Sequence, residues 1–368
     1  MRSMNWTGSR NDATRVRAGV ATLAIAAALV SLSACGSDGG AEGEASETQV
    51  VLAAPGGSYQ RGMTECAYTK FEEQTGIEVV YQAGVNADNL AKVAAQKSNP
   101  SIDVLQDNTT SHNKGVADGL FEKIDTEAVP NRETVAPHLH PADGYGITAS
   151  GLVAGLEYNA AIFEEHGWSP PTSWMDLWDP KYKGHVAMAP ISSQYMQAFV
   201  AVIAKLHGGS ESNLDPAFDE LSTLKPQLYG LLASPAQLDT AFQQGDAWIG
   251  VNDGARVLEL KESGADVDFV RPEEGSIFIP VGFDIVKGGP NPTAAAKLLD
   301  FLLSKEAQSC FISAASYGIV REDVEIPAEA EHFVPHGSDP SQYTTIDWTA
   351  LATQLSDIAE RWNQTLQD

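Results

Sequence analysis

The stretch over residues 171–193, which reads PTSWMDLWDPKYKGHVAMAPISS, constrains the fold most strongly. It predicts a short Trp-rich helix, a charged corner, a strand over 185–189 and a polar loop that opens a long helix. In open α/β sheets, ligands gather at such loops because free backbone amides and the helix dipole point there. We therefore expect Ser192 and Ser193, in this loop, to form one wall of a binding cleft.

A similar order near the start of the chain supplies a candidate for the opposite wall. A strand over 50–53 is followed by a Gly-rich loop with Gly57, Ser58 and Tyr59, and then by a helix that ends at Gly76. The loop has neither GxGxxG nor a Lys-Ser/Thr ending, so no nucleotide site is indicated. A tight structural turn and a ligand-contacting loop remain equal alternatives.

The third predicted strand, over 102–106, also leads into a polar loop. Asn108 and Thr110 are candidates for ligand contact there, whereas Asp107 is a candidate helix cap. This repeated alternation of strands and helices is typical of an α/β protein.

A fourth polar loop follows a predicted strand over 247–251. It carries Asn252 and Asp253, and Arg256 falls in the first turn of the next helix. The helix dipole disfavours a cation at that position unless an anion is near. Contact of Arg256 with an anionic ligand and an ion pair with an acid such as Glu259 are the two interpretations.

The first residues carry the pattern of a bacterial lipoprotein signal. Four arginines precede an apolar run over 18–30, and Leu-Ser-Ala-Cys ends at Cys35. The run is short for a permanent membrane anchor, which is the alternative. We expect cleavage after residue 34, lipidation of Cys35, and a flexible Gly/Ser-rich and acidic tether over 35–48.

Charge and cysteine content narrow the class of protein. The net charge of −26 argues against a nucleic-acid partner. Cys66 and Cys310 form a disulfide or stay as two buried thiols, and no Cys/His metal spacing occurs. His138 and His140, in an irregular segment, are a weak metal motif, and exposed, solvated histidines are the simpler interpretation.

The length of the chain predicts two domains. Toward the C-terminus the pattern predicts a helix over 214–228, strands over 276–280 and 283–286, and a single amphipathic helix from Trp348 to Leu366.

Four motifs in order carry a family resemblance: GGSY at 56–59, FEEQTGIEVV at 71–80, TSWMDLWDPKYKG at 172–184 and KLLDFLLSKEAQ at 297–308. With them the chain resembles the extracellular solute-binding proteins of ABC importers, in the spermidine/putrescine-binding-like branch. The resemblance implies a two-lobed α/β periplasmic-binding-protein (type II) fold with crossover strands between the lobes. It also implies a monomer that captures a small-molecule solute by lobe closure and delivers it to an ABC permease.

The resemblance further implies how the chain is divided. After the signal peptide (1–34) and tether (35–48), lobe I takes 49–145 and 280–318, and lobe II takes 146–279 and the tail 319–368. Cys66 and Cys310 would share lobe I. The protein would be extracytoplasmic, attached to the membrane only through its lipid, with no cofactor, metal or catalytic residue.

The family's ligand contacts match Ser58, Tyr59, Asn108, Thr110, residues 191–193, Asn252 and Tyr317. The positions at which this chain differs from the family's pattern are informative, because polyamine binders surround their ligand with aromatic side chains and carboxylates. This chain has Pro190 and Ile191, Val251, Ile279 and Val281 where those groups would stand. The resemblance with these departures predicts a polar organic solute, with Arg256 available for a carboxylate or phosphonate.

Two alternatives remain open. One is a true polyamine binder. The other is a lipid-anchored hydrolase, which would have to bring together residues such as Ser193 and His185.

Overall fold

The structure is a computed structural model that describes residues 47–141, 143–335 and 340–366. The predicted signal peptide, Cys35 and nearly all of the predicted tether lie outside the described residues. In the described part of the chain, no helix is long and apolar enough to cross a membrane.

One lobe is built on three parallel strands, in the order β2-β1-β3. They are β1 (Gln49–Ala54), β2 (Glu78–Ala83) and β3 (Val104–Asp107). Alternate residues of β1 pack into two different cores: Val50 and Leu52 on one face, Val51 and Ala53 on the other. This period of two is what a strand buried on both faces requires.

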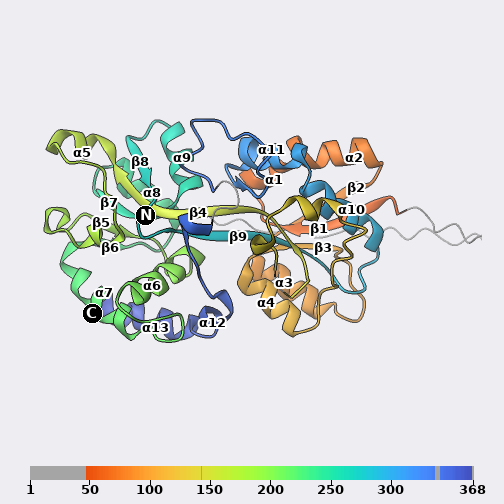
Figure 1. Cartoon of the computed structure of the whole chain (residues 1–368), viewed down its shortest axis with the longest axis horizontal. Coiled ribbons are helices and arrows are strands. Elements are labelled where there is room, and N and C mark those ends of the chain that lie inside the picture. The colour runs from red at the N-terminus through yellow and green to blue at the C-terminus, as the bar shows by residue number, and fades with distance from the viewer. Residues whose placement is uncertain (1–46, 142, 336–339, 367–368) are drawn as a thin grey trace, which may run out of the picture. The chain divides into compact units, whose positions relative to one another are not determined.

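Helices cover both faces of this sheet (Figure 1). On the first face lie α1 (Ser58–Met63), a π-helical turn over Thr64–Tyr68, α2 (Thr69–Thr75), α10 (Pro292–Leu302) and α11 (Lys305–Ala315). On the second face lie α3 (Asn86–Ala95) and α4 (Thr109–Ala117). The predicted helix end at Gly76 is confirmed, since this residue is left-handed with φ 69°.

The second lobe is built on three more parallel strands, in the order β7-β5-β6. They are β5 (Val186–Met188), β6 (Leu228–Leu231) and β7 (Ile249–Asp253). The other elements of this part are α5 (Ala160–His166), α6 (Gln194–Leu206), α7 (Asp215–Leu224), α8 (Pro235–Gln243), α9 (Gly254–Glu262), β8 (Val267–Val270), α12 (Trp348–Ala352) and α13 (Leu355–Leu366). They share the largest core cluster.

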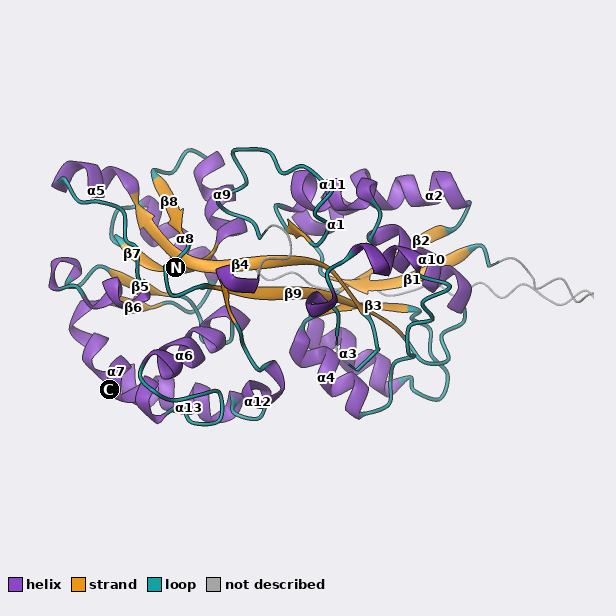
Figure 2. Ribbon diagram, in the orientation of Figure 1, coloured by secondary structure: helices purple, strands orange, loops and turns teal. Residues whose placement is uncertain are grey.

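Two long antiparallel strands join the lobes, β4 (Ile147–Asn159) and β9 (Ser276–Ile285) (Figure 2). One end of β9 pairs with β3, and the far end of β4 pairs with β7 and β8. Two short strands pair with the long ones: β10 (Gly318–Ile319) pairs with β4 at Ser150 and Gly151, and β11 (Tyr343–Thr344) pairs with the first residues of β9, Ser276 and Ile277. Each long strand therefore belongs to both lobes, as the predicted crossover strands require; the exact lobe boundaries stay predictions.

Three predicted elements differ from the structure. The helix predicted over 214–228 stops at Leu224, before Pro226, and the missed strand β6 follows it. The two strands predicted over 276–286 are one strand, because Pro280 lies opposite Gly151 in the ladder without ending it. The C-terminal helix is two helices, α12 and α13.

A disulfide joins Cys66, in the π-helical turn, to Cys310 in α11, with 5.6 Å between the Cα atoms. It ties an early helix to one that returns 244 residues later.

Candidate functional site

Five residues from four loops form what we call the strand-end surface: Tyr59, Tyr195, Asn252, Asp253 and Tyr317. Tyr59 follows β1, Tyr195 follows β5, and Asn252 and Asp253 end β7. Tyr317 follows α11. The surface draws on residues from both lobes.

On the first lobe, two tyrosine rings lie against each other. The ring centroids of Tyr59 and Tyr317 are 5.2 Å apart. Gly57 makes the contact possible by adopting φ 78° just before α1, a backbone conformation that a side chain would disfavour. Ser58 is exposed at the same turn, whereas Tyr59 is buried.

Electrostatics link this pair to the second lobe. Burial raises the pKa of Tyr317, and the Asp253 and Glu259 carboxylates raise it further. Burial also raises the pKa of Tyr59, and the neighbouring phenols of Tyr68 and Tyr317 raise it further. Both phenols are therefore neutral.

On the second lobe, Asn252 is held in a buried polar network. Its Nδ2 donates to Glu157 Oε2 at 2.8 Å, and its Oδ1 accepts from the Tyr195 hydroxyl at 3.2 Å. Burial raises the pKa of Glu157 to about 8. Because Asn252 is fully buried and already bonded, it positions Tyr195 and the start of α9.

Asp253 and Arg256 occupy the first turn of α9. Asp253 caps the helix, since its Oδ1 accepts from the backbone N–H of Arg256 at 2.9 Å. The Arg256 guanidinium is bound by the carboxylate of Asp239 through two hydrogen bonds of 3.0 and 2.9 Å. Of the two interpretations of Arg256, the structure shows the ion pair, with Asp239 and not Glu259 as the acid.

The remaining predicted ligand residues lie at or near the starts of α4 and α6. Asn108 is half-buried and caps α4, its Oδ1 accepting from Ser111 N at 2.9 Å, so the expectation that Asp107 is the cap was wrong. Thr110 is half-buried in the first turn of α4. Ser192 is exposed and Ser193 begins α6.

Three of the five apolar substitutions noted in the sequence lie in the cores. Val251, Ile279 and Val281 are all buried, with exposed fractions of 0%, 5% and 7%. Their side chains are therefore packed in the protein interior.

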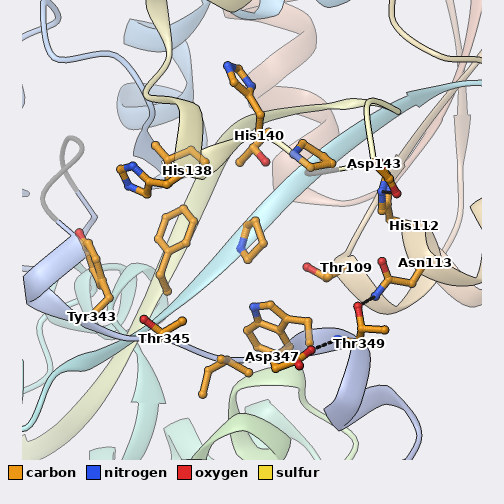
Figure 3. A pocket seen from close by; sticks show the side chains of 18 of the residues that line it. Thr109, His112, Asn113, His138, His140, Asp143, Tyr343, Thr345, Asp347 and Thr349 are labelled. Atoms are coloured by element: carbon orange, nitrogen blue, oxygen red, sulfur yellow. Dashed lines mark hydrogen bonds and ion pairs between the residues drawn. The ribbon is translucent and has the colours of Figure 1, made fainter.

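A cavity of about 480 Å³ lies over the crossover strands. Phe278, Pro280 and Gly282 of β9 and Thr148 of β4 line it, together with Thr109 of α4. Figure 3 shows it between the segment carrying His138 and His140 and the segment 345–349. Asn113 closes one end by donating to Thr349 Oγ1 at 3.2 Å. We call it the hinge cavity; of the described residues, none of the strand-end surface lines it.

One wall of the hinge cavity contains a cluster of acids around a histidine. The His112 Nδ1 is 2.7 Å from Asp284 Oδ2, and its Nε2 is 3.1 Å from Asp143 Oδ2. Asp107 completes the cluster, and ligand atoms of Asp107, His112 and Asp284 lie within 4.8 Å of one another. The sequence did not predict this cluster, because Asp284 is far from Asp107 and His112 along the chain. Within the sequence, the acids themselves are the only local signal of the cluster.

The histidines that the sequence did single out are engaged elsewhere. His140 Nε2 contacts the Arg132 carbonyl oxygen at 2.9 Å. His185 stacks on Trp248 with centroids 3.6 Å apart, and its Nδ1 contacts the Asp246 carbonyl oxygen at 2.8 Å. These contacts give no support to a nucleophile and base pair between Ser193 and His185.

Comparison with known proteins decides the family. The model of the family described as bacterial extracellular solute-binding protein matches residues 67–334. The chain belongs to this family. The predicted relationship to solute-binding proteins of ABC importers is therefore confirmed, as is the function class of a receptor for a small polar solute.

Relatives and solved structures agree with this assignment. A periplasmic protein of Salmonella typhimurium, provisionally named for binding 2-aminoethylphosphonate, is 25% identical over 306 residues, covering 81% of this chain and 86% of the relative. The spermidine/putrescine-binding periplasmic protein of Escherichia coli K12 is 26% identical over 246 residues, or 64% and 68% of the two chains.

Two solved structures have the same fold. An ABC transporter structure from Clostridium perfringens has a TM-score of 0.75 at 24% identity, covering 86% of this chain and 99% of the other. A periplasmic binding protein from Actinobacillus pleuropneumoniae with fructose-6-phosphate bound has a TM-score of 0.68 at 23% identity, covering 88% and 99%. The two-lobed periplasmic-binding-protein fold predicted from the sequence is confirmed.

Proposed function

We propose that this family member captures a small polar solute carrying an ammonium group at the strand-end surface and delivers it, chemically unchanged, to an ABC permease. One geometric observation supports the proposal: the rings of Tyr59 and Tyr317 lie against each other on the first lobe, while Asp253 ends a strand of the second lobe. A solute between these groups would contact both lobes only when they are closed, which is how binding drives closure.

The charges around this surface favour a cationic group. Asp253 supplies a carboxylate and the Tyr59–Tyr317 pair supplies aromatic rings, a combination that suits ammonium groups through charge and cation–π attraction. The guanidinium of Arg256 is bound by Asp239. The two ligands named for the relatives, polyamines and 2-aminoethylphosphonate, share a primary amine.

A substitution of Asp253 by Asn tests the charge of the solute. Asn is also a good N-cap, so the Asp253→Asn variant removes the carboxylate charge while keeping the cap of α9. The solute is first identified by native mass spectrometry of freshly purified protein and by a thermal-shift panel of polyamines, aminophosphonates, carboxylates and sugar phosphates. Calorimetry then compares affinities of the wild type and the variant.

We expect Asp253→Asn to weaken binding about tenfold or more, since hydrogen bonds to charged groups contribute about 1.5–3 kcal/mol. Tyr317→Ala should also weaken it, whereas the control Tyr229→Ala, at an exposed tyrosine of β6, should not. Tighter binding by Asp253→Asn would instead assign an anionic solute. Conversion of the solute during incubation would contradict the non-catalytic role.

The position at the membrane is a separate part of the proposal. We infer that Cys35 is lipidated after removal of residues 1–34, because the sequence there has the lipoprotein pattern. Wild-type protein should sediment with membranes, and its N-terminal peptide should carry the mass of an acylated cysteine. Cys35→Ser should release the protein from the membrane; retention of this variant in the membrane would favour an uncleaved apolar anchor.

A further inference from the structure

The cluster at the wall of the hinge cavity contains two buried acids that are incompletely satisfied. Asp107 and Asp284 have exposed fractions of 2% and 0%. Among the described residues, neither oxygen of the Asp107 carboxylate has a hydrogen-bond partner, and the same holds for Asp284 Oδ1. Two buried carboxylates this close, with three oxygens lacking donors, need a cation or a shared proton.

Two glycines lie against these carboxylates, and the lack of a Cβ at each leaves space for the carboxylate oxygens. A Cβ at Gly282 would lie 2.8 Å from Asp107 Oδ1, and one at Gly146 would lie 2.6 Å from Asp284 Oδ1. Any other residue at these positions would push the acids aside. Both glycines therefore allow the backbone of the crossover strand and its neighbouring loop to approach the cluster closely.

The histidine is oriented by its second nitrogen. His112 Nε2 contacts Asp143 Oδ2 at 3.1 Å, while Nδ1 points to Asp284 and the ring stacks on Phe121. Ligating histidines commonly have one nitrogen on the metal and the other held by a carboxylate, which fixes the tautomer. Asp143 is placed to hold the imidazole in this way.

We propose that Asp107, His112 and Asp284 bind one divalent transition-metal ion, with Asp143 orienting the imidazole. Two carboxylates and a neutral imidazole neutralise a doubly charged ion, and the mixed oxygen and nitrogen donors suit Zn²⁺ or Mn²⁺ better than Mg²⁺ or Ca²⁺. Asp107, His112 and Asp143 line the hinge cavity, which offers an entry path.

The ion would tie together three elements. Asp107 ends β3, His112 lies in α4, and Asp284 lies in the crossover strand β9. The metal would therefore hold the crossover strand to the first lobe beside the hinge. It would not contact the solute at the strand-end surface, so this inference is independent of the proposed function.

The test uses the full mature protein carrying no polyhistidine tag. Metal content is measured by elemental analysis before and after dialysis against a chelator. Zn²⁺, Mn²⁺ and Mg²⁺ are then titrated by calorimetry and thermal shift. We expect one equivalent of Zn²⁺ or Mn²⁺, no comparable binding of Mg²⁺, and a rise in Tm of about 4 °C at a 100-fold excess over Kd.

Variants locate the ion. Asp107→Asn, which keeps the side-chain shape, and His112→Asn should each weaken binding at least 100-fold, and Asp143→Asn should weaken it about 10–100-fold. His138→Ala is the matched control, because His138 lines the same cavity outside the cluster. The proposal is overturned if the wild type binds no stoichiometric metal, which would assign a shared proton to the acids. Binding that is lost in His138→Ala but kept in Asp107→Asn would overturn it too.

Discussion

Glu157 provides a direct test of how the buried network beneath the strand-end surface is charged. It is fully buried in β4, and only Oε2 is bonded, to Asn252 Nδ2 at 2.8 Å. Burial raises its pKa from 4.5 to about 8, with nearby Asp239 and Asp253 adding to the effect and Arg256 opposing it. The folded protein therefore holds a proton on Glu157 more tightly than the unfolded chain does.

The sign of the pH dependence follows from this difference. Between pH 4.5 and about 8, unfolding releases the proton of Glu157, so the free energy of unfolding falls as the pH rises. From pH 6 to pH 8 the loss from this one group is about 2 kcal/mol, since each pKa unit corresponds to about 1.4 kcal/mol. For a folded unit of about 320 residues this lowers Tm by about 3 °C.

The perturbation is Glu157→Gln, which keeps the shape of the side chain and an oxygen that can accept from Asn252, but cannot ionise. Tm is measured by calorimetry at pH 6 and pH 8, with a chelator present and without solute. We expect the difference in Tm between the two pH values to change by about 3 °C in the variant, which should be relatively more stable at pH 8.

The control is Glu259→Gln, the same chemical change at an exposed position in α9. It should leave the pH dependence as in the wild type. If Glu157→Gln and the wild type lose the same stability between pH 6 and pH 8, then Glu157 is ionised in the folded protein and the reasoning is refuted.

Three further substitutions test other parts of the structure. Trp174→Ala should cost about 3–5 kcal/mol in urea unfolding, because the side chain is fully buried, while the affinity of the folded protein for solute should not change. Replacing Cys66 and Cys310 together by Ala should lower the free energy of unfolding by up to about 5 kcal/mol, the entropy of a loop of 244 residues; unchanged denaturant curves would contradict this. Arg256→Gln breaks the half-buried pair with Asp239 and should cost about 1 kcal/mol, with solute affinity falling less than in Asp253→Asn; a larger loss of affinity would place the guanidinium on the solute.

Local patterns explain why much of the fold was predictable. Strand β1, the helix end at Gly76 and the strand after Trp178 each carry a periodicity or a terminating residue within a short window. The elements that were wrong depend on neighbours. Strand β6 is only four residues long and only partly buried, and it forms because β5 offers it an edge. Pro280 is tolerated within β9 because β4 holds the strand on one side.

The site was only partly predictable for the same reason. Asn252, Asp253 and Arg256 were found as candidates because they follow a strand and open a helix. That Arg256 is bound by Asp239 could not be read from the sequence, since the partner lies on a different helix, α8. Which charged residues on different helices pair depends on their distance in space, and a short stretch of sequence does not reveal that distance.

The sequence by itself determined the family, the alternation of strands and helices, and the positions of the polar loops, since these depend on local periodicity and on motifs in order. Only the tertiary structure decided which charges meet. It paired Arg256 with Asp239, and it placed Asp107, His112 and Asp284 together although Asp284 lies in the returning crossover strand. The physical reason is that electrostatic interactions act through space over a few ångströms. The number of residues between two charges along the chain does not tell how far apart they lie in the folded protein.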